Sequence, residues 1–281
     1  MSHKSRLYTF LNSSKTISLL AFDGSDFFET FWSDHPNTAP SIQRFFLESL
    51  LSLQTMINFL KPTEHLGIYL ESTDGPSPFQ FNLEMFEHGS TRSLITPKTL
   101  TSLPELFTGR CRLVKFLPNQ QAPYQTILAF QDSEFLDIIK EIFSQSYQIE
   151  CDLFIDTQNL KSIFAYKLPS LANNLATKVD QLQSVGSWLS SNLENFRPYF
   201  AQSIHGVKDT VQFFEKVDLE YQSSKVITYS CHCSRARFHK HLYGLGSTEI
   251  HKILHEDHEI KVTCDYCQNE YIFTAPDFVW Q

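Results

Sequence analysis

Four of the six cysteines form two close pairs near the C-terminal end of the chain, Cys231-X-Cys233 and Cys264-X-X-Cys267, with thirty residues between them. Each pair brings two sulfur atoms to one side of a tight turn. Together the pairs can complete the tetrahedral four-thiolate shell that Zn²⁺ accepts in closed structural sites. They fall in a stretch of about 50 residues, which is too short to build much of a core. This pattern strongly predicts a zinc site.

Three interpretations of the site compete: a purely structural zinc module, a nucleic-acid-binding module and a redox switch. Residues 226–281 contain five Lys or Arg against seven Asp or Glu, which argues against nucleic acid. The positive charge of Arg235 and Arg237 beside the first pair favours thiolate, and both pairs could close local disulfides on oxidation. A ring as tight as Cys-X-Cys is strained and readily reduced again. Spacing alone does not choose between structural zinc and a switch.

The other two cysteines, Cys111 and Cys151, lie in β-like runs. Arg110 and Arg112 could activate Cys111, but a buried strand cysteine is the favoured interpretation, because free cysteine is usually buried. Six of the eleven histidines lie near the cysteine pairs and are alternative ligands in principle. Since four thiolates already fill the shell, we expect most of them to be solvated: His232, His239, His241, His251, His255 and His258.

Local signals predict the elements that position the cysteines. Ser234 can cap a helix over residues 235–242, and Gly244 can end it. Residues 259–263 and 271–274 have strand character around the second pair. Such a unit gains much of its folding energy from the metal, so we expect it to unfold when zinc is lost.

The first 170 residues indicate an α+β core. Residues 79–85 alternate between apolar and polar, as in a half-buried strand, and residues 41–60 have helical periodicity after Pro40. A second helix is expected over residues 133–144. Strands and helices do not alternate strictly, so the sheet should be mainly antiparallel. The other β-like runs are 16–22, 65–71, 111–117, 124–130, 148–155 and 162–168.

The composition changes after residue 170, where serine, asparagine and glutamine become common. Apolar residues at helical spacing predict amphipathic helices in this segment. Because Gly186, Asn192 and Pro198 interrupt them, we expect these helices to keep their shape only while docked on another element. We therefore predict three domains: an α+β core over 1–170, a metastable helical linker over 171–228 and a zinc-binding domain over 229–281. The apolar residues at helical spacing in the linker are Leu175, Val179, Leu182, Val185, Leu189 and Leu193.

Composition narrows the class of function. The net charge is −8 with no basic strip, so nucleic acid is not an expected partner. No apolar run reaches the roughly 20 residues of a membrane span, and the short run 17–22 is followed by Asp23, so we expect a cytosolic protein. Neither a phosphate-binding loop nor a G-x-S-x-G elbow occurs, so no enzyme and no ATP dependence are expected. The 25 phenylalanines fit a core, or partly a surface that accepts apolar segments.

The C-terminal part of the chain contains a series of motifs: Cys231-His-Cys-Ser-Arg, Leu245-Gly246, Glu249, Ile260-Lys-Val-Thr-Cys264-Asp-Tyr-Cys267, Tyr271 and Phe273. These residues closely resemble those of the 33 kDa heat-shock proteins, the bacterial redox-regulated holdase chaperones also called 33 kDa chaperonins. Landmarks in the same order through the core are His35-Pro36, Glu48, Asp74-Gly75-Pro76, Glu84, Pro123-Tyr124-Gln125, Ser146-Tyr-Gln148 and Leu168-Pro169.

The resemblance implies an ATP-independent holdase that is idle when reduced and zinc-bound. Oxidants with unfolding stress would form the disulfides Cys231–Cys233 and Cys264–Cys267 and release the zinc. The C-terminal unit would then disorder, the linker would undock, and the active homodimer would hold unfolding client proteins in the bacterial cytoplasm. Reduction and zinc rebinding would reverse the switch.

The core departs from the family pattern in three places. Arg92-Ser93 stands where the family has Arg-Gly, Tyr147 replaces an acidic residue, and residues 156–158 replace a glycine pair. These departures concern the dimer contacts and the client surface rather than the switch. They leave open an alternative function, a constitutively folded zinc-stabilised interaction module without a redox response.

Overall fold

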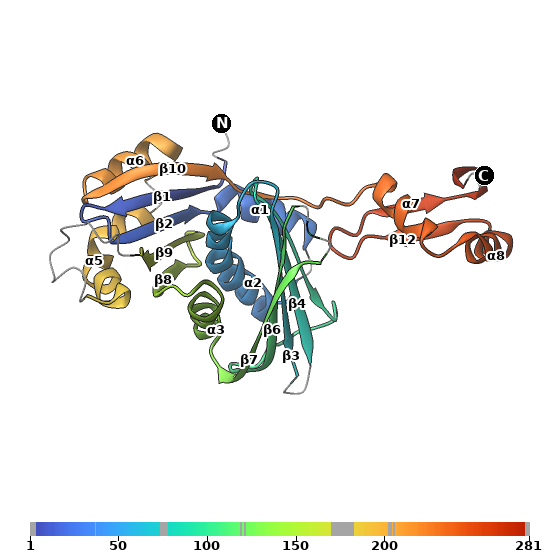
Figure 1. The fold of residues 1–281 in the computed structure, drawn as a ribbon, viewed down its shortest axis with the longest axis horizontal. Helices are drawn as coiled ribbons and strands as arrows, with labels where there is room; N and C mark the ends of the chain where they lie inside the picture. The colour runs from blue at the N-terminus through green and yellow to red at the C-terminus, as the bar shows by residue number, and fades with distance from the viewer. Residues whose placement is uncertain are drawn as a thin grey trace. The chain divides into compact units, whose positions relative to one another are not determined.

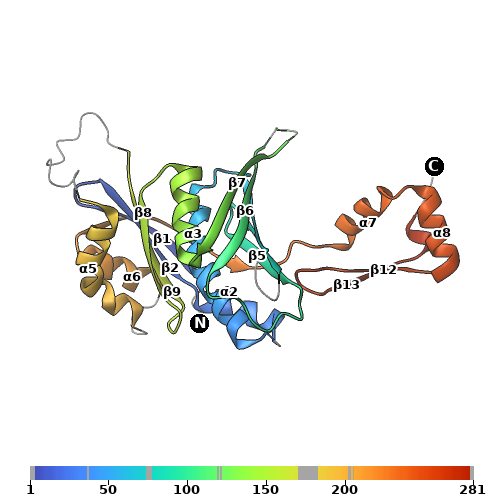
Figure 2. The ribbon, with the colours of Figure 1, turned by 90° about the horizontal axis from the view of Figure 1, so that it is seen from below.

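The computed structural model describes residues 4–36, 38–73, 78–118, 120, 122–169, 183–201, 204 and 206–278. The chain divides into two compact units, Met1–Tyr229 and Ser230–Gln281. Figures 1 and 2 show the elements of both units. Within the described residues, the structure contains no helix with the length and apolar character needed to cross a bilayer.

The first unit contains a five-stranded sheet in the order β10-β1-β2-β9-β8, in which every neighbouring pair is antiparallel. All seven residues of β2 are buried, because this strand lies inside the sheet with both faces covered. The strands are β1 (Arg6–Asn12), β2 (Ile17–Asp23), β8 (Cys151–Asp156), β9 (Lys161–Lys167) and β10 (Leu219–Val226).

A six-stranded sheet in the order β11-β5-β4-β3-β6-β7 forms the other half of the unit. Its pairs are antiparallel except for β11 with β5, which is parallel. Burial alternates along β4, so only one face of this sheet faces the core. The strands are β3 (His65–Ser72), β4 (Phe79–Phe86), β5 (Ser90–Thr96), β6 (Phe107–Phe116), β7 (Tyr124–Ser133) and β11 (Thr228–Tyr229).

Helices α2 and α3 lie between the two sheets (Figures 1 and 2). Their apolar residues join those of both sheets in one large core that is rich in phenylalanine. Pro40 occupies the first turn of α2, where its missing N–H costs nothing. The helical elements of this part are α1 (Ser25–Asp34), α2 (Pro40–Leu53), the 3₁₀ turn η1 (Gln54–Phe59), α3 (Phe135–Ile142) and the π-helical turn η2 (Phe143–Tyr147).

Helices α5 (Val185–Phe200) and α6 (Gly206–Glu215) cover the other face of the five-stranded sheet (Figure 2). They form a second core with inward side chains of β1, β2 and β9. On β9, Ile163 and Ala165 face this second core, whereas Phe164 faces the first. The five-stranded sheet is therefore covered on both faces.

The second unit is small. It consists of α7 (Arg235–Tyr243), α8 (Ser247–Asp257), a hairpin of β12 (Ile260–Thr263) and β13 (Glu270–Phe273), and the short turn η3 (Ala275–Asp277). Its core has four buried apolar side chains among the described residues: Ile250, Ile260, Phe273 and Phe278. A core of this size is too small to stabilise a domain by itself, so the unit needs a further stabilising element.

The structure confirms the predicted α+β class with mainly antiparallel sheets. Each predicted β-like run between residues 16 and 168 contains part of a strand. The helix predicted over 41–60 is an α-helix only to Leu53 and continues as the 3₁₀ turn η1. The strands β1, β5, β10 and β11 and the helices α1 and α8 were not predicted.

The helical prediction for 171–228 is wrong for residues 219–226, which form the edge strand β10 because they pair with β1. Val185 and Leu189 are buried as expected, and Leu193 packs against the same core. Leu175, Val179 and Leu182 lie outside the described residues. The division of the first unit into a core and a metastable linker stays a prediction.

His35 makes the stability of the first unit depend on pH. Its ring stacks on Phe31 with centroids 4.3 Å apart, and its Nδ1 lies 2.9 Å from the Phe31 carbonyl. Burial lowers the pKa of His35, with Lys98 acting in the same direction and the Phe31 carbonyl and Asp34 opposing it. The folded state thus disfavours the charged imidazolium. The contribution of neutral His35 to the unfolding free energy is therefore lost as the pH falls below the ordinary histidine pKa of about 6.5.

We expect His35→Phe to lose less stability than the unsubstituted protein between pH 7.5 and pH 5.5. Urea unfolding followed by tryptophan fluorescence at both pH values measures the difference. Equal losses in the two proteins would mean that His35 does not contribute to the acid sensitivity.

Candidate metal centre

The structure brings all four predicted cysteines together. Their sulfur atoms lie within 4.8 Å of one another. The closest approaches run across the two pairs: Cys231 Sγ lies 3.6 Å from Cys264 Sγ, and Cys233 Sγ lies 3.3 Å from Cys267 Sγ. Cys264 is buried and the other three are half-buried, so the cluster is shielded but reachable.

The spacing of the sulfurs fits four-coordinate metal binding. With metal–sulfur bonds of about 2.3 Å, as for Zn²⁺, the sulfurs of a regular tetrahedron lie about 3.8 Å apart. The two shortest contacts and the 4.8 Å limit bracket this value. A disulfide needs about 2 Å, and all four thiols are free. The cluster could therefore hold a metal ion.

A tight turn between β12 and β13 positions the second pair. The amide of Cys264 donates to the Asn269 carbonyl at 2.9 Å, and the amide of Gln268 donates to the Cys264 carbonyl at 2.9 Å. Gln268 has a φ of 61°, and its side-chain amide donates to the carbonyls of Cys264 and Asp265. These hydrogen bonds hold the turn in a left-handed conformation that L-residues otherwise disfavour.

The first pair leads directly into α7. Ser234 caps this helix, its hydroxyl accepting from the Arg237 amide at 3.3 Å, and Gly244 follows its last residue, as predicted. Arg235 does not face the sulfurs: its guanidinium donates to Asp277 at 2.7 Å and lies over the Phe273 ring. Arg237 donates to the His232 carbonyl at 3.0 Å. The effect of their positive charge on the first pair stays a prediction.

Tyr271 is the site residue whose role sequence reasoning missed. Its hydroxyl lies 3.2 Å from Cys233 Sγ. Burial raises the pKa of the Cys233 thiol, but the hydrogen bonds of Tyr271 and the other three thiols outweigh it, and the net shift is downward. The same contact raises the pKa of Tyr271 to about 12. Tyr271 thus remains a hydrogen-bond donor that favours thiolate at Cys233.

The histidines near the cluster are mostly exposed, as expected, but His232 and His239 are half-buried. His239 has a defined place in the fold. Its Nε2 lies 2.7 Å from the Asp277 carbonyl, and its ring packs on Phe273 and Phe278. His241, His251, His255 and His258 are exposed. His239 therefore supports the fold of the module.

Cys111 and Cys151 lie in the first unit, away from any cluster that could hold a metal among the residues described. Cys111 is fully buried, and burial raises its pKa to about 12. Successive side chains of a strand point to opposite faces, so Arg110 and Arg112 lie on the face away from its thiol. The favoured prediction of a buried strand cysteine is confirmed.

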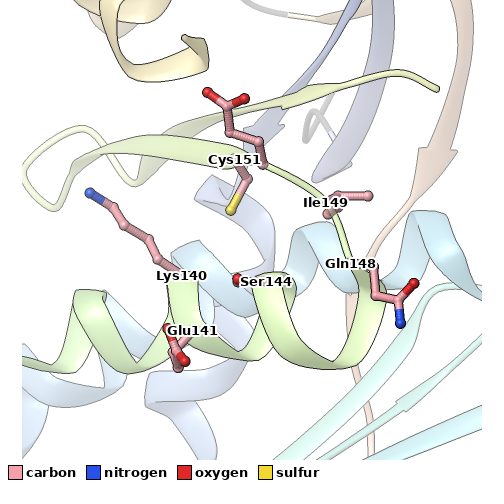
Figure 3. A pocket seen from close by; sticks show the side chains of 7 residues that line it. Lys140, Glu141, Ser144, Gln148, Ile149 and Cys151 are labelled. Carbon is pink, nitrogen blue, oxygen red and sulfur yellow. The ribbon is translucent and has the colours of Figure 1, made fainter. Parts of the chain in front are cut away.

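Cys151 lines a shallow cavity of about 430 Å³ between β8 and α3, with its sulfur directed toward the helix (Figure 3). Burial, followed by the charge of Asp152, raises its pKa to about 12, with Lys140 opposing. A thiol with such a pKa is mainly protonated at neutral pH, which lowers its reactivity.

The fold and the cysteine cluster define a two-unit protein: a mixed, mainly antiparallel core and a C-terminal four-cysteine module. A family model described as "Hsp33 protein" matches residues 5–274, so the chain belongs to the Hsp33 family. The prediction of this family from the sequence is confirmed.

Relatives with the same family name support the assignment. The chain is 26% identical over 180 residues to the 33 kDa chaperonin of Shewanella frigidimarina, covering 63% of this chain and 59% of that protein. It is 22% identical to the 33 kDa chaperonin of Yersinia pestis over 99% of this chain and 94% of that one. The crystal structure of a 33 kDa chaperonin (heat shock protein 33 homologue) from Thermotoga maritima has the same fold. Its TM-score is 0.71 at 15% identity, over 98% of this chain and 96% of that one.

Proposed function

We propose that this protein is a redox-regulated, ATP-independent holdase chaperone of the bacterial cytoplasm. The observation that carries the proposal is the cluster of four free thiols within 4.8 Å, in a chain of the Hsp33 family. No catalytic step is part of it. The function lies in a change of structure triggered at the cysteines.

In the reduced state we propose that Cys231, Cys233, Cys264 and Cys267 are thiolate ligands of one Zn²⁺. When bound, the ion supplies a cross-link between the segment before α7 and the hairpin of β12 and β13. Apolar packing is too small to replace that cross-link, since the described core of the module has four buried apolar side chains. The fold of the module then depends on the thiolates.

Oxidation is proposed to join Cys231 with Cys233 and Cys264 with Cys267. For each disulfide, two thiolates lose two electrons, and one hydrogen peroxide takes up these electrons and two protons from the solvent to give two water molecules. These local disulfides form no cross-link between the segment before α7 and the β12–β13 hairpin. Disulfides across the pairs, Cys231 with Cys264 and Cys233 with Cys267, would instead cross-link the two segments. Unfolding of the module therefore requires the local pairing, although the shortest sulfur contacts run across the pairs.

The proposed consequence is exposure of apolar surface that binds unfolding client proteins. Helices α5 and α6 bury several aromatic side chains against the five-stranded sheet, among them Phe196, Tyr199 and Phe214. If this segment undocks, both its apolar face and the sheet beneath it become available. The oxidised protein is expected to act as a homodimer.

Light scattering from a thermally unfolding client enzyme tests the proposal. Zinc-loaded reduced protein and peroxide-treated protein are compared without ATP, with the zinc content measured in parallel. We expect only the oxidised sample to suppress aggregation, together with zinc release. Peptide mapping should recover the two local disulfides.

A constitutively folded interaction module is the second candidate. The short sulfur contacts across the pairs favour it, because disulfides between Cys231 and Cys264 and between Cys233 and Cys267 would keep the module folded. Equal activity of both samples would remove the redox switch from the proposal, and activity in neither would leave the interaction module.

A further inference from the structure

Lys161 on β9 is a buried cation that no part of the proposed function uses. Its side chain is 1% exposed. The ammonium donates to the carbonyls of Tyr199, Ala201 and Ile204 at 2.9, 3.4 and 3.0 Å, and it lies 4.9 Å from the centre of the Tyr199 ring. Each of these partners belongs to the end of α5 or to the residues just after it.

One of these hydrogen bonds satisfies a group that a helix leaves open, because Tyr199 lies in the last turn of α5, and the other two go to carbonyls that follow the helix. The last four carbonyls of a helix have no partner within it, and they carry the negative end of the helix dipole. Lys161 supplies a donor and a positive charge at that end of α5. Asp23 and Asp156, the residues paired with Lys161 on β2 and β8, also favour its charged form. Burial acts in the opposite direction and lowers the pKa of Lys161.

The opposite end of α5 meets a carboxylate from the same hairpin. Oε1 of Glu150, the residue just before β8, accepts a hydrogen bond from the Val185 amide at 2.7 Å. Val185 is the first residue of α5, so its N–H is one of the free donors at the positive end of the helix. Gly186 leaves room for a second acid: a Cβ there would lie 3.2 Å from Asp152 Oδ2. Asp152 itself pairs with Lys140.

We propose that the β8–β9 hairpin clamps α5 at both ends, through Glu150 at its first residue and Lys161 at its last turn, and that this clamp keeps the α5–α6 segment docked. Both signs match the helix dipole, so the clamp selects one position and direction of α5 on the sheet. Apolar packing of Val185, Leu189 and Phe196 supplies area without that directional selection. The role in regulation rests on the proposed function, whereas the clamp itself does not.

Lys161→Met tests the clamp. It keeps the length of the side chain but leaves three carbonyls without their donor, and buried unsatisfied groups are costly. Hydrogen–deuterium exchange is measured on the full chain, reduced and loaded with zinc. We expect exchange over residues 185–215 to rise about tenfold to a hundredfold. The strands β3, β4 and β6 should stay within about twofold, because the clamp does not contact them.

Three further variants keep the test decisive. Lys161→Arg retains the charge and the donors and should restore slow exchange. Glu150→Gln weakens the other end, where charge–dipole effects are smaller, and should raise exchange about two- to fivefold. Phe164→Leu lies on the same strand but faces the first core, so it should not open residues 185–215 selectively.

Selective opening in Lys161→Met that is reversed in Lys161→Arg supports the clamp. Unchanged exchange in Lys161→Met overturns it, as does an equal rise in the core strands together with no effect of Glu150→Gln. The same Lys161→Met protein, kept reduced, is then assayed for suppression of client aggregation. Selective opening without suppression upholds the clamp and counts against the proposed function of the released segment.

Discussion

Replacing Cys264 with serine is expected to abolish zinc binding and to unfold residues 230–278 while the first unit stays folded. Cys264 is the most deeply buried of the four proposed ligands, at 3% exposure, and a serine hydroxyl is a poor substitute for a thiolate. In zinc-finger peptides, metal binding contributes an apparent free energy of about 10–16 kcal/mol to folding. That contribution is as large as the whole unfolding free energy of a typical domain, about 5–15 kcal/mol.

Metal analysis and hydrogen exchange of the purified protein measure this effect. Cys151→Ser is the matched control, because it makes the same replacement in the other unit, and it should retain a full zinc content. Retained zinc together with protected amides in β12 and β13 of Cys264→Ser would contradict the proposed ligand set. Adding a chelator to the unsubstituted protein should reproduce the unfolding of the module.

Phe45→Ala should lower the unfolding free energy of the first unit by about 3–5 kcal/mol, the usual cost of truncating a buried phenylalanine. Phe45 is 4% exposed and projects from α2 into the six-stranded sheet. Its ring centre lies 5.2 Å from that of Phe81, 5.9 Å from Phe107 and 5.0 Å from Phe135. Truncation would leave a cavity at the junction of β4, β6 and α3.

Urea unfolding followed by tryptophan fluorescence, to which Trp32 on Phe31 contributes, measures the loss. Leu106→Ala serves as the control: Leu106 is 48% exposed, so a change within about 0.5 kcal/mol is expected. A loss below about 1 kcal/mol in Phe45→Ala would show that the core collapses around the missing ring.

The parts of the fold that local pattern specifies were predictable. The alternation of β4 and the caps of α7 depend on neighbouring residues, and both elements form where expected. β1 and β5 were missed because their residues do not alternate clearly, and β10 because its pairing with β1 overrides a helical pattern. Arg6 pairs with Val226, and no local signal reports a partner at that distance along the chain.

The grouping of the four cysteines was predictable, and their surroundings were not. Each pair is close in sequence and therefore close in space, and the four-thiolate shell of a zinc site is the reason to expect the two pairs together. The contact of Tyr271 with Cys233 and the pairing of Arg235 with Asp277 join residues about forty positions apart. Only the folded hairpin and helix bring these groups together.

The placement of α5 and α6 between β9 and β10 has a kinetic consequence. Both strands belong to the five-stranded sheet, where β9 pairs with β2 and β10 pairs with β1. A segment that leaves the sheet while these strands stay paired remains tethered at both ends. Its return is then unimolecular, because the segment and the sheet belong to one chain. Recovery of the docked state should therefore be independent of protein concentration.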